Sequence, residues 1–217
     1  MIYMCNNLEL KEVFTDNNYC FTALKSSEEL ITFLEDLMPR GSVVSVGGSM
    51  TLFESGVIDL LRSGRYVFLD RYEEGADTEE IFRKAFSADY YLASANALTE
   101  HGEVYMVDGH GNRIAATVFG PKHVILICGR NKLVRNLREA IYREKTVATP
   151  KNCERLDKKS YCRYNGSCLK PEMDEDHLMC AWYCPDSICA NTMILGKQNS
   201  SNRGRIHIIL VDEDLGY

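Results

Sequence analysis

The sequence lacks the features that mark membrane and secreted proteins. No apolar run approaches the roughly 20 residues that a membrane-spanning helix needs. The first residues have neither the basic start nor the apolar stretch of a signal peptide. Both absences favour a cytoplasmic protein with no membrane partner. No internal repeat is visible, and 217 residues suffice for one large α/β domain with a buried core.

Positive charge is also scarce. Lys and Arg number 25 against 31 Asp and Glu, a net charge of −6. Since nucleic-acid-binding proteins gain most of their affinity from Lys and Arg on phosphates, this balance predicts no nucleic-acid partner. Two basic groups remain as local candidates for a patch, although the plainer interpretation of both is solvated helix faces and loops. They are Arg62, Arg65 and Arg71, and then Arg130, Lys132, Arg135 and Arg138.

Several motifs of well-known chemistry are missing. Neither GxGxxG nor a Walker loop occurs, so the sequence does not support a dinucleotide or ATP site. There is no HExxH motif, and no Ser–His–Asp order can be argued. None of the nine cysteines forms a CxxC, the strongest single sign of a thiolate metal site.

Apolar periodicity predicts an α/β fold. Helices are expected from Ser26 to Met38, between Gly48 and Gly64, and from Asp77 to Phe86. Strands at 42–46, 66–70 and 89–95 alternate with them, which is typical of a mostly parallel sheet covered by helices. The sequence also predicts a β-hairpin of 103–107 with 113–119, a central strand at 123–128 followed by a helix, and a last strand at 205–211.

We therefore predict one α/β domain over residues 1–217, a three-layer sandwich with a mostly parallel sheet. Residues 150–203, rich in Cys, Asn, Lys and Ser, are expected to form a loop-like insertion before the last strand.

The best candidate for a binding site is the turn after the first predicted core strand. Gly47 and Gly48 let the backbone approach a ligand closely, and the free N–H groups of the following helix favour an anion. Ser49 and Thr51 add hydroxyl donors. In an open parallel sheet such a turn lies at the carboxyl edge, where ligands bind. The alternative is that the glycines only make a tight turn and that Ser49 or Thr51 caps the helix.

A second segment follows a strand end in the same way. Asn96 and Thr99 are candidates to orient a polar ligand in the same crevice. Glu100 is a candidate acid, base or nucleophile, with an ordinary polar loop residue as the plainer interpretation.

Blocks along almost the whole chain resemble the lactate-utilization (LUD) domain family. They are Gly47–Leu52 with Glu54, Leu69–Tyr72, Ala95–Glu100 with Gly102, Asp108–Arg113, Phe119–Lys122, Gly129–Lys132 and the ending Arg205–Tyr217. The resemblance implies a fold similar to the group of CoA-transferases, ribose-5-phosphate isomerases and glucosamine-6-phosphate deaminases. It also implies a role in oxidative use of L-lactate or a related organic acid, alongside iron–sulfur partner proteins.

The resemblance supplies no settled reaction and no catalytic residue. By analogy with the fold group, an anionic small molecule is expected near Gly47, Gly48, Ser49, Asn96, Glu100, Gly102 and Asn112. Members of that group often form dimers, so a homodimer is a further expectation. A true acyl-CoA transferase using Glu100 or Glu54 is the least favoured possibility, since it needs a covalent thioester intermediate.

Six of the nine cysteines fall between residues 153 and 189. A subset of LUD proteins has a similar Cys-rich stretch, and thiolates are the preferred ligands of zinc and iron–sulfur clusters. The candidate ligands are Cys162, Cys168, Cys184 and Cys189, with Cys180 as a substitute. The alternative is a set of reduced thiols or a labile disulfide pair that senses redox state.

Overall fold

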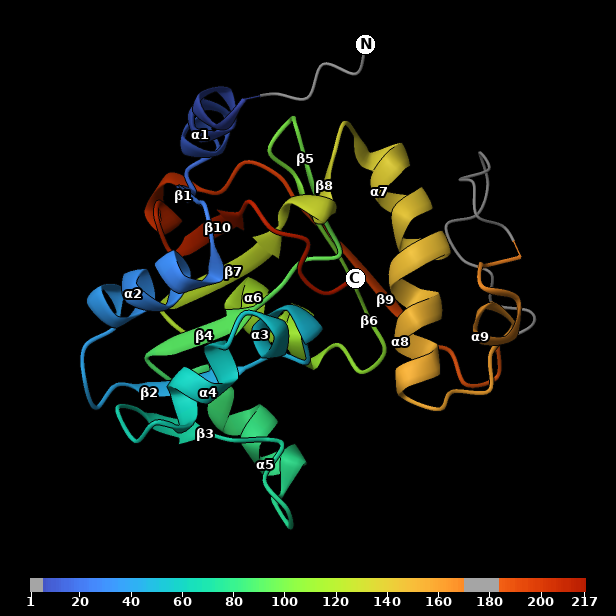
Figure 1. The fold of residues 1–217 in the computed structure, drawn as a ribbon, viewed down its shortest axis with the longest axis horizontal. Helices are drawn as coiled ribbons and strands as arrows, with labels where there is room; N and C mark the ends of the chain where they lie inside the picture. The colour runs from blue at the N-terminus through green and yellow to red at the C-terminus, as the bar shows by residue number, and fades with distance from the viewer. Residues whose placement is uncertain (1–5, 170–183) are drawn as a thin grey trace.

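The centre of the protein is a six-stranded parallel sheet, seen in a computed structural model that describes residues 6–169 and 184–217 (Figure 1). In space the strands run β1-β10-β7-β4-β2-β3. They are β1 (Cys20–Leu24), β2 (Val43–Val46), β3 (Val67–Leu69), β4 (Tyr90–Ala93), β7 (His123–Gly129) and β10 (Ile206–Val211). The predicted α/β fold with a mostly parallel sheet is confirmed.

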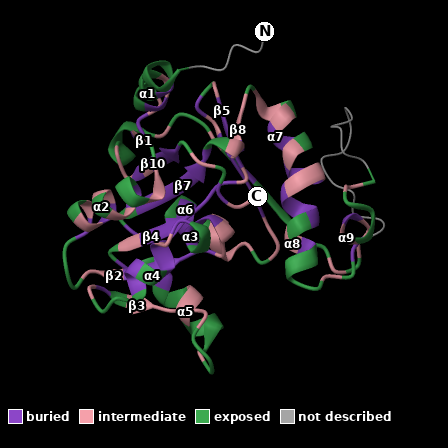
Figure 2. Ribbon diagram, in the orientation of Figure 1, coloured by how far each residue is buried: buried purple, intermediate pink, exposed green. Residues whose placement is uncertain are grey.

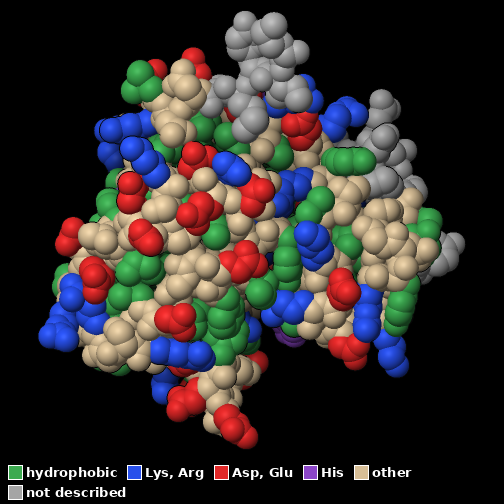
Figure 3. All heavy atoms as spheres, in the orientation of Figure 1, with side chains coloured by type: hydrophobic (Ala, Val, Ile, Leu, Met, Phe, Trp, Pro, Cys, Tyr) green, Lys and Arg blue, Asp and Glu red, His purple; other side chains and the backbone are tan. Residues whose placement is uncertain are grey.

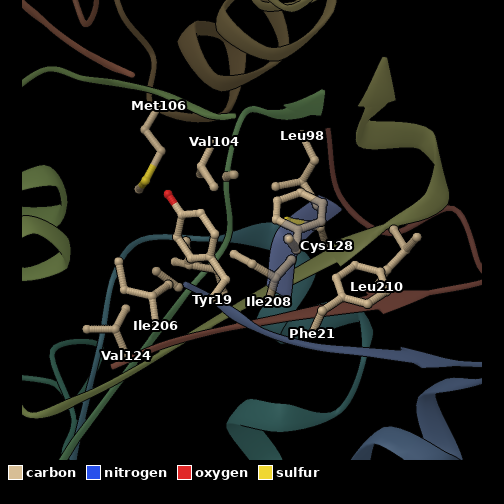
Figure 4. Close-up of a cluster of buried hydrophobic side chains, with 14 of the residues drawn as sticks. Tyr19, Phe21, Leu98, Val104, Met106, Val124, Cys128, Ile206, Ile208 and Leu210 are labelled. Atoms are coloured by element: carbon tan, nitrogen blue, oxygen red, sulfur yellow. The ribbon is translucent and has the colours of Figure 1, made fainter. Parts of the chain in front are cut away.

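Both faces of this sheet are buried, because successive side chains of a strand point to opposite sides. On β7, Ile125 and Ile127 face the helices α2 (Ser27–Leu37), α3 (Met50–Glu54) and α4 (Val57–Arg62). Val124, Leu126 and Cys128 face the other way, toward α1 (Asn7–Asp16) and α6 (Asn112–Phe119). Figure 4 shows part of this second core cluster, and Figure 2 shows the central strands as buried.

A smaller sheet lies against the second core cluster. Its order is β8-β5-β6-β9, with antiparallel pairing of β5 with β6 and of β6 with β9. The strands are β5 (Ala97–Thr99), β6 (Val104–Asp108), β8 (Leu133–Val134) and β9 (Asn191–Leu195). One face, with Leu98, Val104 and Met106, joins the core of the large sheet. The opposite face is covered by α7 (Leu137–Arg143).

Helix α7 continues without a break into η3 (Glu144–Ala148), a π-helical turn, and α8 (Thr149–Arg155). Figure 1 shows them as one rod beside β6 and β9, with α9 (Tyr161–Asn165) beyond it. Helix α5 (Thr78–Lys84) and three short 3₁₀ turns complete the described elements: η1 (Ala85–Ser87), η2 (Arg130–Lys132) and η5 (Ser200–Asn202). None of the helices in the described ranges is long and apolar enough to cross a membrane.

The predicted hairpin is wrong in its second strand. Residues 112–119 form the helix α6 because Asp108 caps it: one carboxylate oxygen accepts hydrogen bonds from the backbone N–H of Arg113 (2.9 Å) and Ile114 (3.2 Å). Gly111, at a φ of 81°, turns the chain into the helix. Strand β6 pairs instead with the preceding β5 and with β9.

Other boundaries also differ from the predictions. Helix α1 and strand β1 were not predicted, and the helix expected between Gly48 and Gly64 is two helices separated at Gly56, whose φ is 75°. The segment 150–203 is not simply loop-like, since it holds most of α8, all of α9 and β9. Strand β9 is defined by its pairing with β6, a non-local contact that local sequence does not indicate.

Candidate functional site

A polar cavity lies at the carboxyl edge of the large sheet. Its volume is about 350 Å³, and its walls include Gly48 and Ser49 after β2, Ser94 and Asn96 after β4, and Lys132 after β7. The start of α6 and the side of α8 close it. Figure 3 shows this face hollowed between the large sheet and the α7–α8 rod, with Lys and Arg side chains along the hollow. This is where ligands bind in open parallel sheets.

The lining of this cavity is strongly cationic. Of the described residues, five cationic side chains line it against one acidic side chain, that of Asp108. The cations are Arg71, Arg113, Lys132, Arg155 and Lys158. Asp108 is already engaged with the backbone N–H groups of α6. Among the described residues, only Lys158 of these cations is in an ion pair, with Asp186 at 3.2 Å. The cavity therefore carries positive charge that the described residues do not neutralise.

Lys132 is the most unusual of these cations. Its side chain is only 3% exposed, and its Nζ donates hydrogen bonds to Thr51 Oγ1 (2.8 Å) and Ser94 Oγ (2.9 Å). Both partners are neutral hydroxyls. Burial lowers the pKa of Lys132 to about 8, and the nearby Arg143 and Arg113 act in the same direction. A buried lysine with no contacting carboxylate among the described residues is costly, so its presence at a cavity points to function.

Arg113 shapes the wall of the cavity. Its guanidinium donates to the carbonyl oxygens of Ser94 (2.9 Å) and Val107 (2.6 Å) and to Asn96 Oδ1 (3.0 Å). Gly47 makes room for it, because a Cβ there would lie 2.9 Å from Arg113 Cγ. Arg113 therefore ties the end of β4 to the second sheet and spreads positive charge along the wall.

Arg71 also lines the cavity and is only partly buried. Its guanidinium carbon lies 4.5 Å from the centre of the Phe82 ring and 5.5 Å from that of Tyr72. Its Nη1 would be 3.6 Å from a Cβ added at Gly48. The aromatic rings hold the guanidinium in place without neutralising it, so Arg71 is available to an anion.

The helix that follows the glycine turn favours an anion less than the sequence suggests. Helix α3 has only five residues, so its dipole is small, and Ser49 makes no capping hydrogen bond. The Ser49 hydroxyl oxygen is buried and has no hydrogen-bond partner in the described part of the chain. A buried hydroxyl in the wall of a polar cavity is a donor for a bound molecule.

A second cavity, of about 240 Å³, lies on the other side of α8. All five described cysteines of the C-terminal third line it: Cys153, Cys162, Cys168, Cys184 and Cys189. Val107, Thr149 and Ile188 line both cavities, so the two are neighbours.

Two thiols of this cavity face each other. The Sγ atoms of Cys153 on α8 and Cys162 on α9 are 3.8 Å apart, and Ser160 Oγ lies 3.4 Å from Cys162 Sγ. The hydrogen bond between the two thiols lowers the pKa of Cys162 and raises that of Cys153. Cys189 lies 3.3 Å from a carboxylate oxygen of Glu144, and burial raises the pKa of both groups.

The described thiols do not form a metal site as they stand. Within residues 6–169 and 184–217, no group of three or more His, Cys, Asp or Glu side chains is arranged to hold a metal ion. Cys180, the predicted substitute ligand, lies outside the described residues. The expected ligands Cys162, Cys168, Cys184 and Cys189 thus share a cavity but not a coordination sphere.

A family model described as the LUD domain matches residues 8–211, almost the whole chain. The chain belongs to the LUD domain family. The fold agrees: the crystal structure of a DUF162 family protein from Deinococcus radiodurans superimposes with a TM-score of 0.51 at 12% identity, covering 94% of each chain. The crystal structure of eIF2B beta from Chaetomium thermophilum gives a TM-score of only 0.40 at 14% identity. That match covers 54% of this chain and 42% of the other, and the likeness is too weak to support a functional inference. No curated protein matches.

Four of the predicted ligand-binding residues line the polar cavity of this LUD domain: Gly48, Ser49, Asn96 and Asn112. Gly47 lies behind Arg113, outside the lining. Thr51 is fully buried beneath the turn, where its hydroxyl donates to the carbonyl oxygen of Leu215 (3.1 Å) and accepts from Lys132.

The other candidates lie outside the lining of the cavity. Thr99 hydrogen-bonds the carboxylate of Glu103 in the β5–β6 turn, and the backbone N–H of Glu100 donates to Val134 (2.9 Å). Gly102 is packed under α1, where a Cβ would lie 2.5 Å from Asn17 Nδ2. The carboxylate of Glu54 accepts a hydrogen bond from the backbone of Gly216 (2.6 Å).

The sequence patterns did not indicate the main cations of the site. Lys132 was grouped with Arg130, Arg135 and Arg138 as a solvated face, yet it is buried, and Arg113 was placed in a strand. One signal was available for Lys132: it follows β7 directly, at the same edge as the glycine turn. Only the fold brings Arg155 to the same cavity.

Proposed function

We propose that this LUD-domain protein binds a small organic anion at the carboxyl edge of its large sheet, in the service of lactate or related organic-acid utilization. The charge balance of the cavity carries this proposal: five cations face one carboxylate, which is already engaged, in the part of the chain that the structure describes. An anion there would gain charge-assisted hydrogen bonds from Arg71 and Lys132 and a donor from Ser49.

Titration calorimetry with lactate, a phosphorylated sugar and an acyl-CoA tests this proposal. The variant Gly48→Val fills the cavity from a position where a Cβ makes only ordinary contact, so we expect the fold to persist and binding to fall at least tenfold. Gly196→Val is the matched control, because its Cβ would meet nothing within 4 Å and the residue lies outside the cavity. Absence of binding by all three anions, or equal binding by both variants, would contradict the proposal.

A second candidate is a redox function of the second cavity, which five cysteines line and which we call the thiol cavity. The 3.8 Å separation of the Cys153 and Cys162 sulfurs favours it. Hydrogen peroxide would oxidise the pair to a disulfide: the two thiols lose two electrons and two protons, and the peroxide is reduced to water. The expected result is one disulfide, found by peptide mapping, that is absent in Cys153→Ser and present in Cys20→Ser. A mapped disulfide elsewhere would contradict it.

Metal binding at the same cysteines requires them to converge further than they do here. Elemental analysis of protein purified without oxygen tests it directly. Stoichiometric zinc or iron that is lost in the double variant Cys162→Ser, Cys168→Ser would support the metal alternative. A metal-free preparation would contradict the metal alternative.

A further inference from the structure

Lys132 has the setting of a nucleophilic amine rather than of a surface cation. Its side chain lines the polar cavity while being 3% exposed. Its Nζ is fixed by the hydroxyls of Thr51 and Ser94, at 2.8 and 2.9 Å, and no ion pair holds it among the described residues. A lysine that only balanced charge would lie beside a carboxylate, as Lys158 does beside Asp186.

We infer that Lys132 forms an imine with the carbonyl carbon of an anionic aldehyde or ketone bound in this cavity. This inference rests on the proposed function and deepens it, since it adds a carbonyl group to the expected anion. Buried lysines near other cations are the ones that act in this way. The cations of the wall would hold the carboxylate or phosphate of the same molecule, which orients its carbonyl toward the amine.

The chemistry balances without a redox partner. The neutral Nζ of Lys132 adds to the carbonyl carbon, and the carbonyl oxygen gains protons and leaves as water, so that a C=N bond replaces the C=O bond. The hydroxyl of Ser94, which contacts Nζ and lines the cavity, is placed to relay the protons from the amine.

The lowered pKa of Lys132 supports this reaction. With a pKa of about 8, roughly one molecule in ten carries the neutral amine at pH 7. An ordinary solvated lysine is neutral in roughly one of every three thousand molecules at that pH. Lys132 therefore has a far larger fraction of the nucleophilic form than the exposed lysines.

Borohydride trapping tests the inference on the full-length protein. Pyruvate and ribose 5-phosphate serve as probes, one a carboxylate and the other a phosphate, and peptide mapping locates the reduced adduct. We expect a stable adduct at Lys132 with at least one probe. The probe that reacts shows whether the site takes a carboxylate or a phosphate. Lactate, which has no carbonyl, should form no adduct. The wild-type map also reports on Lys158, which lines the same cavity.

Two variants sharpen the result. Lys132→Arg keeps the charge but cannot form an imine, so labelling should be lost, whereas Lys11→Arg, an exposed position on α1 outside the cavity, should be labelled as the wild type is. Because the wild-type map already locates the adduct, the test does not depend on either variant folding. Adducts spread over several lysines, or confined to Lys158, would overturn the inference.

Calorimetry separates this inference from the proposed function. If a probe binds and Lys132 remains unmodified after reduction, the imine is wrong while anion binding stands. If neither probe nor any of the anions named above binds, both the proposed function and the imine are overturned.

Discussion

At the scale of single residues, the cavity depends on small side chains as much as on charged ones. Gly47 leaves the space that Arg113 and Tyr91 occupy: a Cβ would lie 2.9 Å from both Arg113 Cγ and the Tyr91 hydroxyl. Gly48, one residue on, meets only Arg71 at an ordinary distance. Two adjacent glycines thus have different roles, one structural and one at the ligand surface.

We predict that Gly47→Ala destabilises the protein by about 1–3 kcal/mol, the usual cost of overpacking. The displaced Arg113 should also weaken anion binding. Urea unfolding measures the first effect, with Gly196→Ala as the control expected to change the free energy of unfolding by less than about 0.5 kcal/mol. Equal stability of the two variants would contradict the assigned role of Gly47.

The buried charge of Lys132 predicts a pH dependence of stability. Its pKa is about 8 in the folded protein, against an ordinary value of 10.5. Arg113, Arg143, Glu54 and Cys128 are the charged or titratable groups that act on it, and burial outweighs them all. Between these two pH values the unfolded chain binds more protons than the folded one, so the contribution of Lys132 to the free energy of unfolding rises with pH.

Comparison of the wild type with Lys132→Met isolates this contribution, because the other titrating groups are common to both proteins. The stability difference, wild type minus variant, should increase from about pH 8 to about pH 10.5 and be constant below pH 8. Chemical unfolding over that range measures it. A difference that decreases with pH would show that Lys132 is stabilised as a cation in the folded state.

At the scale of elements, the walls of the cavity are held by caps and turns rather than by long helices. Asp108 ends β6 and caps α6, so one carboxylate joins the second sheet to the cavity wall. The π-helical turn η3 places buried Glu144 beside Cys189 and Thr149 in the thiol cavity. Such turns often occur at functional sites, because they change which face of a helix its side chains occupy.

We predict that Asp108→Ala lowers the free energy of unfolding by roughly 0.5–2 kcal/mol, as loss of a helix cap does. It should also disturb anion binding, because α6 carries Asn112 and Arg113 into the cavity. Asn6→Ala removes the cap of α1, which lies outside the cavity, and is the matched control. Asn6→Ala should reduce the free energy of unfolding by a similar amount and leave the dissociation constant for the anion unchanged.

At the scale of the whole molecule, the last residues join the two sides of the site. Leu215 is 4% exposed in the core under α3 and α4, and the carbonyl oxygen of Gly216 accepts a hydrogen bond from Asn131 Nδ2 (3.0 Å). Tyr217 then lines the polar cavity, and its hydroxyl accepts a hydrogen bond from Arg155 (2.8 Å) on α8. The end of the chain thus links the glycine turn to the α7–α8 rod.

We predict that Leu215→Ala costs about 2–5 kcal/mol of stability, as for other fully buried leucines. Binding should weaken as well, because this segment positions Thr51 and Tyr217. Leu8→Ala is the control, since Leu8 is 67% exposed. A thermal melt of each variant, followed by calorimetry at a temperature where both are folded, separates the two effects.

The sequence by itself determined the class of fold, the order of most helices and strands and the position of the glycine turn, because these follow from local periodicity and from Gly conformations. It also placed the cysteines in one region. The tertiary structure decided which polar residues meet. Lys132, Arg113 and Arg155 come from separate segments and converge only when parallel strands end at a common edge and α8 closes over them. Whether a lysine is solvated or buried depends on those non-local contacts. The strand at 191–195 depends on them too, because it is defined by its pairing with β6.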